Sequence, residues 1–164
     1  TNALIDLVGL DPVRERIEHL GLTRTALLDR VREDRGPDDA PHFALSTTRD
    51  LTTMFSALMN GRAISAAVSA EVVGWLALNA DLGLAAGATG LDPLAHAGTG
   101  KELLLVNKTG RDRGIRAEAG VLAGPRAGVA YAMIVQFTEH TPLDRLRVQD
   151  AFRVFGADLM ESVH

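Results

Sequence analysis

A Lys-Thr-Gly tripeptide at residues 108–110 is the stretch of this sequence best suited to chemistry. It places a cation, a hydroxyl and a glycine side by side, directly after the apolar residues Leu103 to Val106 and the polar Asn107. The apolar run is too short for a helix and ends in a β-branched residue, so it predicts a buried strand. The glycine would let a ligand or another backbone come close to the strand edge.

Two further strand-like runs follow this tripeptide. They cover residues 115–123 and 129–137, and the glycines and the proline of residues 124–128 predict a turn between them. We therefore expect residues 103–110 to start an antiparallel meander of three strands. A helix over residues 142–161 should cover it, because its apolar residues form a stripe and its start carries a capping signal.

The sequence before the meander predicts short helices around one long loop. Residues 23–45 are polar and rich in proline, so we expect a loop there, either functional or a plain surface connection. Trp75 is expected to anchor the core. The helices are expected over residues 2–8 and 11–20, from the Thr47–Asp50 start signal to Gly61, from Ser65 or Ser69 through Leu78, and near 80–88.

The composition is that of an ordinary globular protein. The 164 residues are 46% hydrophobic and 23% charged, with a net charge of −4 and no long basic run, which argues against nucleic acid as a partner. No apolar run is long enough to cross a membrane. There is no cysteine, so disulfides and thiolate metal sites are excluded. No signal-peptide pattern is seen, and we expect Thr1 to be a processed end or the start of a fragment.

Residues Val106 to Gly120 resemble the Lys-Thr-Gly strand and the strand after it in class A β-lactamases and related serine hydrolases. The resemblance covers nearly the whole chain but only the C-terminal part of the family's domain. Other stretches match the family in the same order: Thr1–Gly9, the helix after its Ser-Asp-Asn element; Leu20–Thr23 with Leu28–Arg30, the approach to its Ω-loop; and Ser46–Phe55, the helix after that loop.

The resemblance implies an α+β fold of the β-lactamase/transpeptidase type, an α/β sandwich in which helices flank an antiparallel meander beside a helical subdomain. Residues 1–164 would form one partial domain. Residues 1–100 would be its mainly helical portion, with the Ω-like loop at 23–45, and residues 101–164 would supply three strands and the last helix.

The function implied is acyl transfer through a serine. In this family a Ser-x-x-Lys serine attacks an acyl carbonyl of a β-lactam, peptide or ester and forms an acyl-enzyme. Neither Ser-x-x-Lys nor Ser-Asp-Asn occurs in these 164 residues. Both would belong to an N-terminal segment of the same domain, which would be a partner of this chain beside the small-molecule acyl substrate. This chain alone is expected to be inactive.

The resemblance also assigns roles on the strands. Lys108 would be the catalytic cation beside the nucleophile, and Thr109 would offer its hydroxyl to a substrate carboxylate, with Gly110 next to it. The backbone N–H of Arg111 would be one oxyanion-hole donor. Arg116 falls where the family often holds an arginine for the substrate carboxylate. The side chains of Arg111 and Arg113 are expected to form a solvated charge cluster.

The Ω-like loop departs from the family pattern. After Leu28-Asp29-Arg30 a class A enzyme carries a glutamate that positions the deacylating water, but Arg32 stands in that place and Glu33 lies one step further on. Glu33 is retained as a catalytic candidate after a local shift, against the alternative of a plain surface residue. Efficient β-lactam hydrolysis is therefore in doubt.

No cofactor or metal is implied. The five histidines, His19, His42, His96, His140 and His164, lack metal-ligand spacing, and His96 is expected to be a solvent-exposed loop residue. Two alternatives stay open. One is a non-catalytic binding or structural descendant of the fold, and the other is an N-terminal-threonine hydrolase using Thr1. The residues do not indicate a compartment, whereas relatives of this kind are commonly extracytoplasmic.

Overall fold

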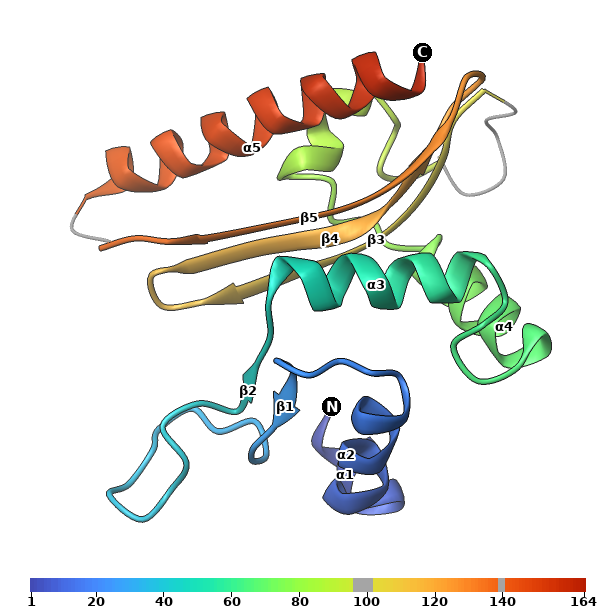
Figure 1. Ribbon diagram of the computed structural model, residues 1–164. Helices are drawn as coiled ribbons and strands as arrows, with labels where there is room; N and C mark the ends of the chain where they lie inside the picture. Colours follow the sequence, from blue (N-terminus) through green and yellow to red (C-terminus); the bar gives the residue numbers. More distant parts are fainter. Residues whose placement is uncertain (96–101, 139–140) are drawn as a thin grey trace. The chain divides into compact units, whose positions relative to one another are not determined.

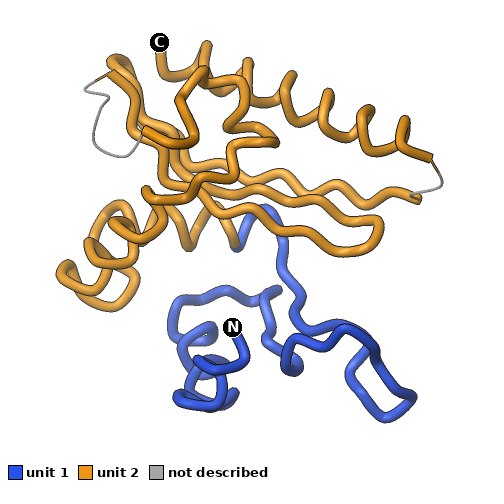
Figure 2. The backbone as a smooth tube through the Cα atoms, turned by 180° about the vertical axis from the view of Figure 1, so that it is seen from behind, with its two compact units in different colours: residues 1–50 blue, residues 51–164 orange. Residues whose placement is uncertain are grey.

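The chain forms two compact units in a computed structural model that describes residues 1–95, 102–138 and 141–164. Residues 1–50 make up unit 1 and residues 51–164 make up unit 2 (Figure 2). The expectations for His96 and His140 lie outside the described residues.

Unit 2 contains the predicted meander. Strands β3 (Leu104–Asp112), β4 (Ile115–Ala123) and β5 (Gly128–Gln136) pair antiparallel in the order β3-β4-β5, so the predicted strands and their order are confirmed. The first strand runs two residues beyond its predicted end, because pairing with β4 continues to the hairpin turn. Gly114 closes this turn with φ of 67°, a left-handed conformation that glycine adopts without steric cost.

Helix α5 (Pro142–Val163) covers one face of the sheet together with the short 3₁₀ helix η1 (Ala85–Thr89) (Figure 1). The predicted capping box is present, since the Thr141 N–H donates to Asp144 Oδ2 at 2.8 Å. The helix and η1 come very close at Gly156, where a Cβ atom would lie 2.1 Å from the Ala85 carbonyl oxygen. The apolar core of this layer includes Leu105, Leu122, Tyr131, Phe152, Leu159 and Val163.

The other face of the sheet packs against residues of α3 (Thr48–Met59) and α4 (Ala66–Leu76), with Phe55 at the centre of this second core. Of the two predicted starts, Ser65 and Ser69, it is Ser65 that caps α4, accepting from the Val68 N–H at 3.2 Å. The expectation that Trp75 anchors the core is wrong: its side chain is 63% exposed, because α4 is apolar on all sides and only one side meets the sheet. No helix in the described ranges is both long and apolar enough to span a membrane.

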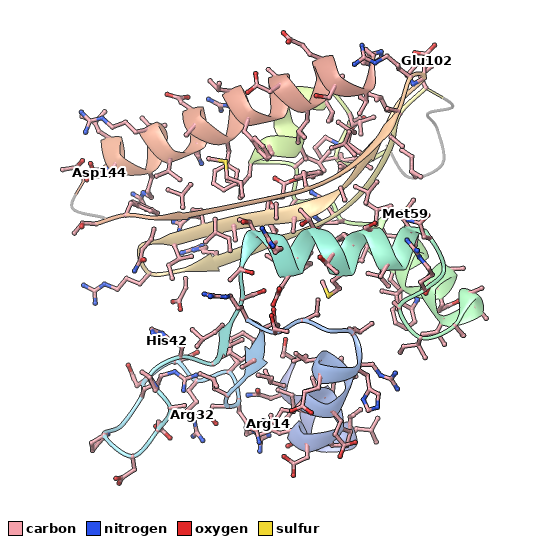
Figure 3. All side chains as sticks on the ribbon, in the orientation of Figure 1. Arg14, Arg32, His42, Met59, Glu102 and Asp144 are labelled. Atoms are coloured by element: carbon pink, nitrogen blue, oxygen red, sulfur yellow. The ribbon has the colours of Figure 1, made fainter. Side chains whose placement is uncertain are left out.

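Unit 1 combines two short helices with a long loop closed by two short strands. Helices α1 (Asn2–Val8) and α2 (Leu10–His19) precede β1 (Ala26–Leu27), which pairs with β2 (Ala44–Leu45). The loop between the strands, residues 28–43, lies within the stretch predicted as irregular; Figure 3 labels Arg32 and His42 in it.

Asp29 is the centre of the loop's polar contacts. Its carboxylate accepts from Arg32 Nε at 2.9 Å and from a terminal nitrogen of Arg35 at 2.8 Å. The same Arg35 nitrogen donates to the Ala40 carbonyl, which ties the two ends of the loop together. The hydrogen bond from Arg32 is the main reason why the pKa of Asp29 lies well below its ordinary range.

Replacing Asp29 with asparagine should loosen this loop. A depressed carboxyl pKa contributes stability above the ordinary value of about 4, and this contribution is lost as the pH falls towards the depressed value. We expect limited proteolysis at neutral pH to cut Asp29→Asn within residues 28–43 about fivefold faster than the wild type. Asp34→Asn, an exposed aspartate of the same loop, is the matched control.

The same prediction can be tested by measuring the cleavage rates at different pH values. With pepsin, the cleavage rates of the wild type and of Asp29→Asn should draw closer as the pH falls from about 4 towards 2, because the Asp29 carboxylate takes up a proton in the opened loop before it does so in the closed loop, and this reduces the advantage of the wild type. Equal rates at neutral pH would show that the carboxylate does not hold the loop.

Candidate active site

Strand β3 carries the Lys-Thr-Gly tripeptide at one edge of the sheet, and no other strand of the described ranges pairs with its outer edge. Side chains alternate between the two faces of a strand. Thr109 and Arg111 share a face with Leu105, which belongs to the core beneath α5. Lys108 and Gly110 lie on the opposite face. Because the two side chains lie on opposite faces, a single ligand could contact both Lys108 and Thr109 only by reaching around the unpaired edge of β3.

Lys108 has an exposed side chain that turns back onto its own strand. Its Nζ donates to the Thr109 carbonyl oxygen at 2.8 Å, which holds the ammonium beside the tripeptide backbone. Gly110 is exposed as well, and a Cβ atom there would make only an ordinary contact of 3.6 Å with Ala117. Packing therefore does not require glycine at this position, whereas access of a ligand to the backbone would benefit from it.

Thr109 donates its hydroxyl to Asp81 Oδ2 at 2.6 Å. Asp81 lies 28 residues earlier in the chain, between α4 and η1, and its side chain is otherwise exposed. Nothing in the sequence singles out this residue, because an aspartate in a Gly- and Ala-rich stretch carries no periodic or motif signal. A carboxylate in contact with the tripeptide is the main feature that the structure adds to this site.

Asp81 is held in place by its neighbours. Asn79 Nδ2 donates to the Asp81 carbonyl oxygen at 3.3 Å, and the Gly83 N–H donates to Asp81 Oδ1 at 3.4 Å. The same Asn79 Nδ2 also donates to Asn107 Oδ1 on β3, at 2.9 Å. Side-chain contacts therefore tie the segment that carries Asp81 to β3 at two points, Asn107 and Thr109.

The neighbouring strand β4 carries a fully buried carboxylate, Glu118, which lies opposite Thr109 in the register. It accepts hydrogen bonds from Asn107 Nδ2 at 2.9 Å, the Tyr131 hydroxyl at 2.7 Å and the Ala86 N–H at 3.2 Å. Burial and the adjacent Glu118 charge raise the pKa of Tyr131 far above its ordinary range, so the phenol stays a donor. Burial of Glu118 is tolerable because its oxygens are hydrogen-bonded.

Gly120 makes room for this network. A Cβ atom at this position would lie 2.4 Å from the Val106 carbonyl oxygen and 2.9 Å from Asn107 Cβ. Gly120 pairs directly with Asn107 in the β3–β4 register, so only a glycine lets the Asn107 side chain lie over β4 and reach Glu118.

Arg116 lies opposite Arg111 in the β3–β4 register, on the α5 face. Its Nη1 donates to the Asp112 and Ile115 carbonyl oxygens at 2.9 and 2.7 Å, and its guanidinium lies over the Phe137 ring, 5.5 Å from the centroid. These contacts fix the guanidinium at the hairpin end of the sheet. Its role toward a substrate, like that of the Arg111 N–H, remains a prediction.

The loop candidates belong to unit 1. Arg32, in the place of the family's glutamate, is bound to Asp29 and lies 3.3 Å from Asp39 Oδ1, so it is part of the loop's own ion pairs. Glu33 has an exposed side chain, and its catalytic role remains a prediction.

One protein-family model, described as the beta-lactamase enzyme family, matches residues 1–163. No curated protein matches the sequence.

Solved structures share the fold at low sequence identity. A β-lactamase from Sphaerobacter thermophilus DSM 20745 superposes with a TM-score of 0.75 at 23% identity, over 94% of this chain and 55% of the other. A class A β-lactamase from Mycobacterium abscessus gives 0.71 at 18% identity, over 96% of this chain and 58% of the other. A mutant of PBP-A, in an acyl-enzyme complex with penicillin G, gives 0.65 at 19% identity, over 96% of this chain and 54% of the other. The chain thus spans little more than half the length of these proteins.

Proposed function

The chain belongs to the beta-lactamase enzyme family, and from this premise we propose that it is the C-terminal portion of a serine hydrolase acting through an acyl-serine. The substrate would be a β-lactam, peptide or ester. The observation that carries the proposal is that the Lys-Thr-Gly tripeptide lies on an edge strand of the described sheet and that its lysine, Lys108, has an exposed side chain. Residues 1–164 would then form one partial domain.

In the proposed reaction, a serine from the N-terminal segment attacks the acyl carbonyl. A bond forms between its Oγ and the acyl carbon, the bond to the leaving nitrogen or oxygen breaks, and the serine proton passes to that leaving atom. Lys108 would supply fixed positive charge for this proton transfer, and the Arg111 N–H would stabilise the oxyanion. Water then hydrolyses the acyl-serine and restores the hydroxyl.

Exposed apolar side chains support the proposed partner segment. Four residues on or beside α4 are open to solvent: Ile64 at 55%, Val68 at 40%, Trp75 at 63% and Leu78 at 66%. A helix that is apolar on all sides is normally buried. Covering this surface would be the task of the N-terminal segment of the same domain.

A labelling experiment tests the proposal. Fluorescent penicillin should leave no covalent label on the denatured 164-residue chain, because none of its five serines has a lysine three positions later. The longer protein that carries Ser-x-x-Lys should be labelled, and replacing that serine by alanine should abolish the label. A covalent label on the 164-residue chain alone would refute this assignment.

The alternative is a non-catalytic descendant of the fold. It is favoured by the loop, where Arg32 occupies the place of the family's glutamate and is engaged by Asp29. A longer protein that lacks Ser-x-x-Lys, or one that carries it and takes no label, would decide for this alternative.

A further inference from the structure

The chain between α4 and η1 passes from one face of the sheet to the other around the edge of β3. Leu76, at the end of α4, packs in the core on the α3 side, whereas Leu82 belongs to the core beneath α5. Between these residues, Asn79 and Asp81 both contact β3, so the crossing lies at this strand (Figure 1). We call residues 77–81 the crossing segment. It lies beside the edge of β3 with which no strand of the described ranges pairs.

Asn107 of β3 is buried and uses both ends of its side-chain amide. Its Nδ2 donates to Glu118 Oε1 at 2.9 Å, and its Oδ1 accepts from Asn79 Nδ2 at 2.9 Å. Because a carboxylate only accepts, the N–H₂ end of Asn107 faces Glu118 and its oxygen faces the crossing segment. Position 79 therefore has to supply a donor. The three side chains form a relay with one direction, in which Asn79 donates to Asn107 and Asn107 donates to Glu118.

The relay reaches the Lys-Thr-Gly tripeptide through two neighbouring contacts. Asn107 directly precedes Lys108 on β3. Asn79 also accepts a hydrogen bond from the Asp81 N–H at 3.4 Å and donates to the Asp81 carbonyl oxygen at 3.3 Å, which fixes the turn that carries the Asp81 side chain. That side chain accepts from the Thr109 hydroxyl at 2.6 Å. Asn79 therefore holds β3 on both sides of Lys108.

Strand β3 lies at an edge of the described sheet, and an edge strand that receives a ligand has two conflicting requirements. Its outer backbone groups have to stay unpaired, because a ligand that adds to the strand uses them. Its reacting groups have to stay in place, because a displacement of about 1 Å can cost about 10²-fold in rate. Side-chain contacts on one face satisfy both requirements, since they hold the strand without pairing with its backbone.

We infer that Asn79 and Asn107 are positioning residues, which carry the fixed position of the buried Glu118 to the strand that holds Lys108 and Thr109. Neither residue has to touch the substrate, because each acts through the next contact of the relay. The relay itself belongs to the 164 residues. The inference rests on the proposed function only in taking Lys108 and Thr109 as parts of the substrate site.

Asn79→Ala breaks the relay at its half-buried end. In the longer protein we expect the maximal rate of labelling by fluorescent penicillin to fall about tenfold, with the half-saturating concentration unchanged, because the tripeptide loses its position and keeps its own groups. Asn60→Ala is the matched control. The Asn60 Nδ2 donates to the Ser56 carbonyl oxygen at 2.8 Å, outside the relay, and this variant should label at the wild-type rate. Circular dichroism checks that both variants are folded at the temperature of the assay.

A reversed relay separates positioning from packing. Asn79→Asp puts an acceptor against the Asn107 oxygen, and Glu118→Gln puts a donor against the Asn107 N–H₂ group, so each change alone should slow labelling about tenfold. In the double variant the Asn107 amide can turn over, accept from the new amide and donate to the new carboxylate, so that both bonds are remade in the opposite direction. The double variant should therefore label within about threefold of the wild type. If it labels no faster than the single variants, the inference is wrong.

Amide hydrogen exchange in the 164-residue chain tests the relay without any acylation. Asn79→Ala should speed exchange of the β3 amides from Lys108 to Arg111 about tenfold and leave those of β5 unchanged. Unchanged exchange in β3, or labelling of Asn79→Ala at the wild-type rate, would overturn the inference. The proposed function fails separately. A longer protein that carries Ser-x-x-Lys and takes no label would refute it, while faster exchange in β3 would leave the relay standing.

Discussion

Replacing Lys108 with alanine should lower the second-order rate constant for acylation of the longer protein by about 10²- to 10⁴-fold. Lys108 is exposed, and its ammonium is held beside the Lys-Thr-Gly backbone by the Thr109 carbonyl oxygen. A fixed positive charge there would favour removal of the proton from the nucleophile, and the variant would lose it. The measurement is the rate of covalent labelling by fluorescent penicillin at several concentrations below saturation.

Arg113→Ala is the matched control for Lys108→Ala. Arg113 is another exposed cation five residues away in the hairpin turn, and its contact to Asp112 comes from the backbone N–H, which alanine keeps. The control should label at nearly the wild-type rate, and both variants should unfold at the wild-type temperature. If Arg113→Ala is as damaging as Lys108→Ala, the effect is one of general surface charge and the role of Lys108 is wrong.

Glu118→Ala should lower the free energy of unfolding by about 3–5 kcal/mol. The substitution removes the acceptor shared by Asn107, Tyr131 and the Ala86 N–H, all of which remain in the interior. Donors buried without a partner keep their full desolvation cost, and the deleted side-chain atoms leave a cavity. Since natural domains are stable by roughly 5–15 kcal/mol, much of the stability would be lost. Urea unfolding followed by circular dichroism measures the change.

Two variants control for this effect. Glu118→Gln keeps the shape and one acceptor oxygen and should lose less than Glu118→Ala, while its new N–H₂ group faces donors and prevents full recovery. Glu161→Ala removes an exposed glutamate from α5 and should be nearly neutral. A loss below about 1 kcal/mol for Glu118→Ala would show that the network can be replaced by water or by repacking.

The three strands and the last helix could be predicted from sequence because their signals are local. Apolar runs with turn residues between them mark strands, and the Thr141–Asp144 box, with Pro142 inside it, marks a helix start. The same locality made the Lys-Thr-Gly tripeptide recognisable in the sequence, because its three residues stand next to each other on one strand, while its role in a site stays a prediction. Membership of the family likewise follows from sequence alone, through residues 1–163.

The contacts that define the site come from pairs far apart in the chain. Asp81 reaches Thr109 across 28 residues, and Glu118 joins Asn107 across 11. Neither pair has a periodic signature, because the contact depends on the strand register and on the path between α4 and η1. Trp75 is the opposite case, a residue whose local pattern gave a clear but wrong prediction. Its helix is apolar on all sides, which predicts burial, but exposure is decided by what packs against each side.

The sequence by itself therefore determined the three strands of the meander, the last helix and the family of this protein, but not the short strands β1 and β2 inside the stretch predicted as a loop. Only the tertiary structure decided which polar groups meet, that the Thr109 hydroxyl is held by Asp81, and that Asn79, Asn107 and Glu118 form one relay. The physical reason is that hydrophobic spacing and turn residues act over a few neighbouring positions, whereas hydrogen bonds and charge depend on distances in space that the fold sets.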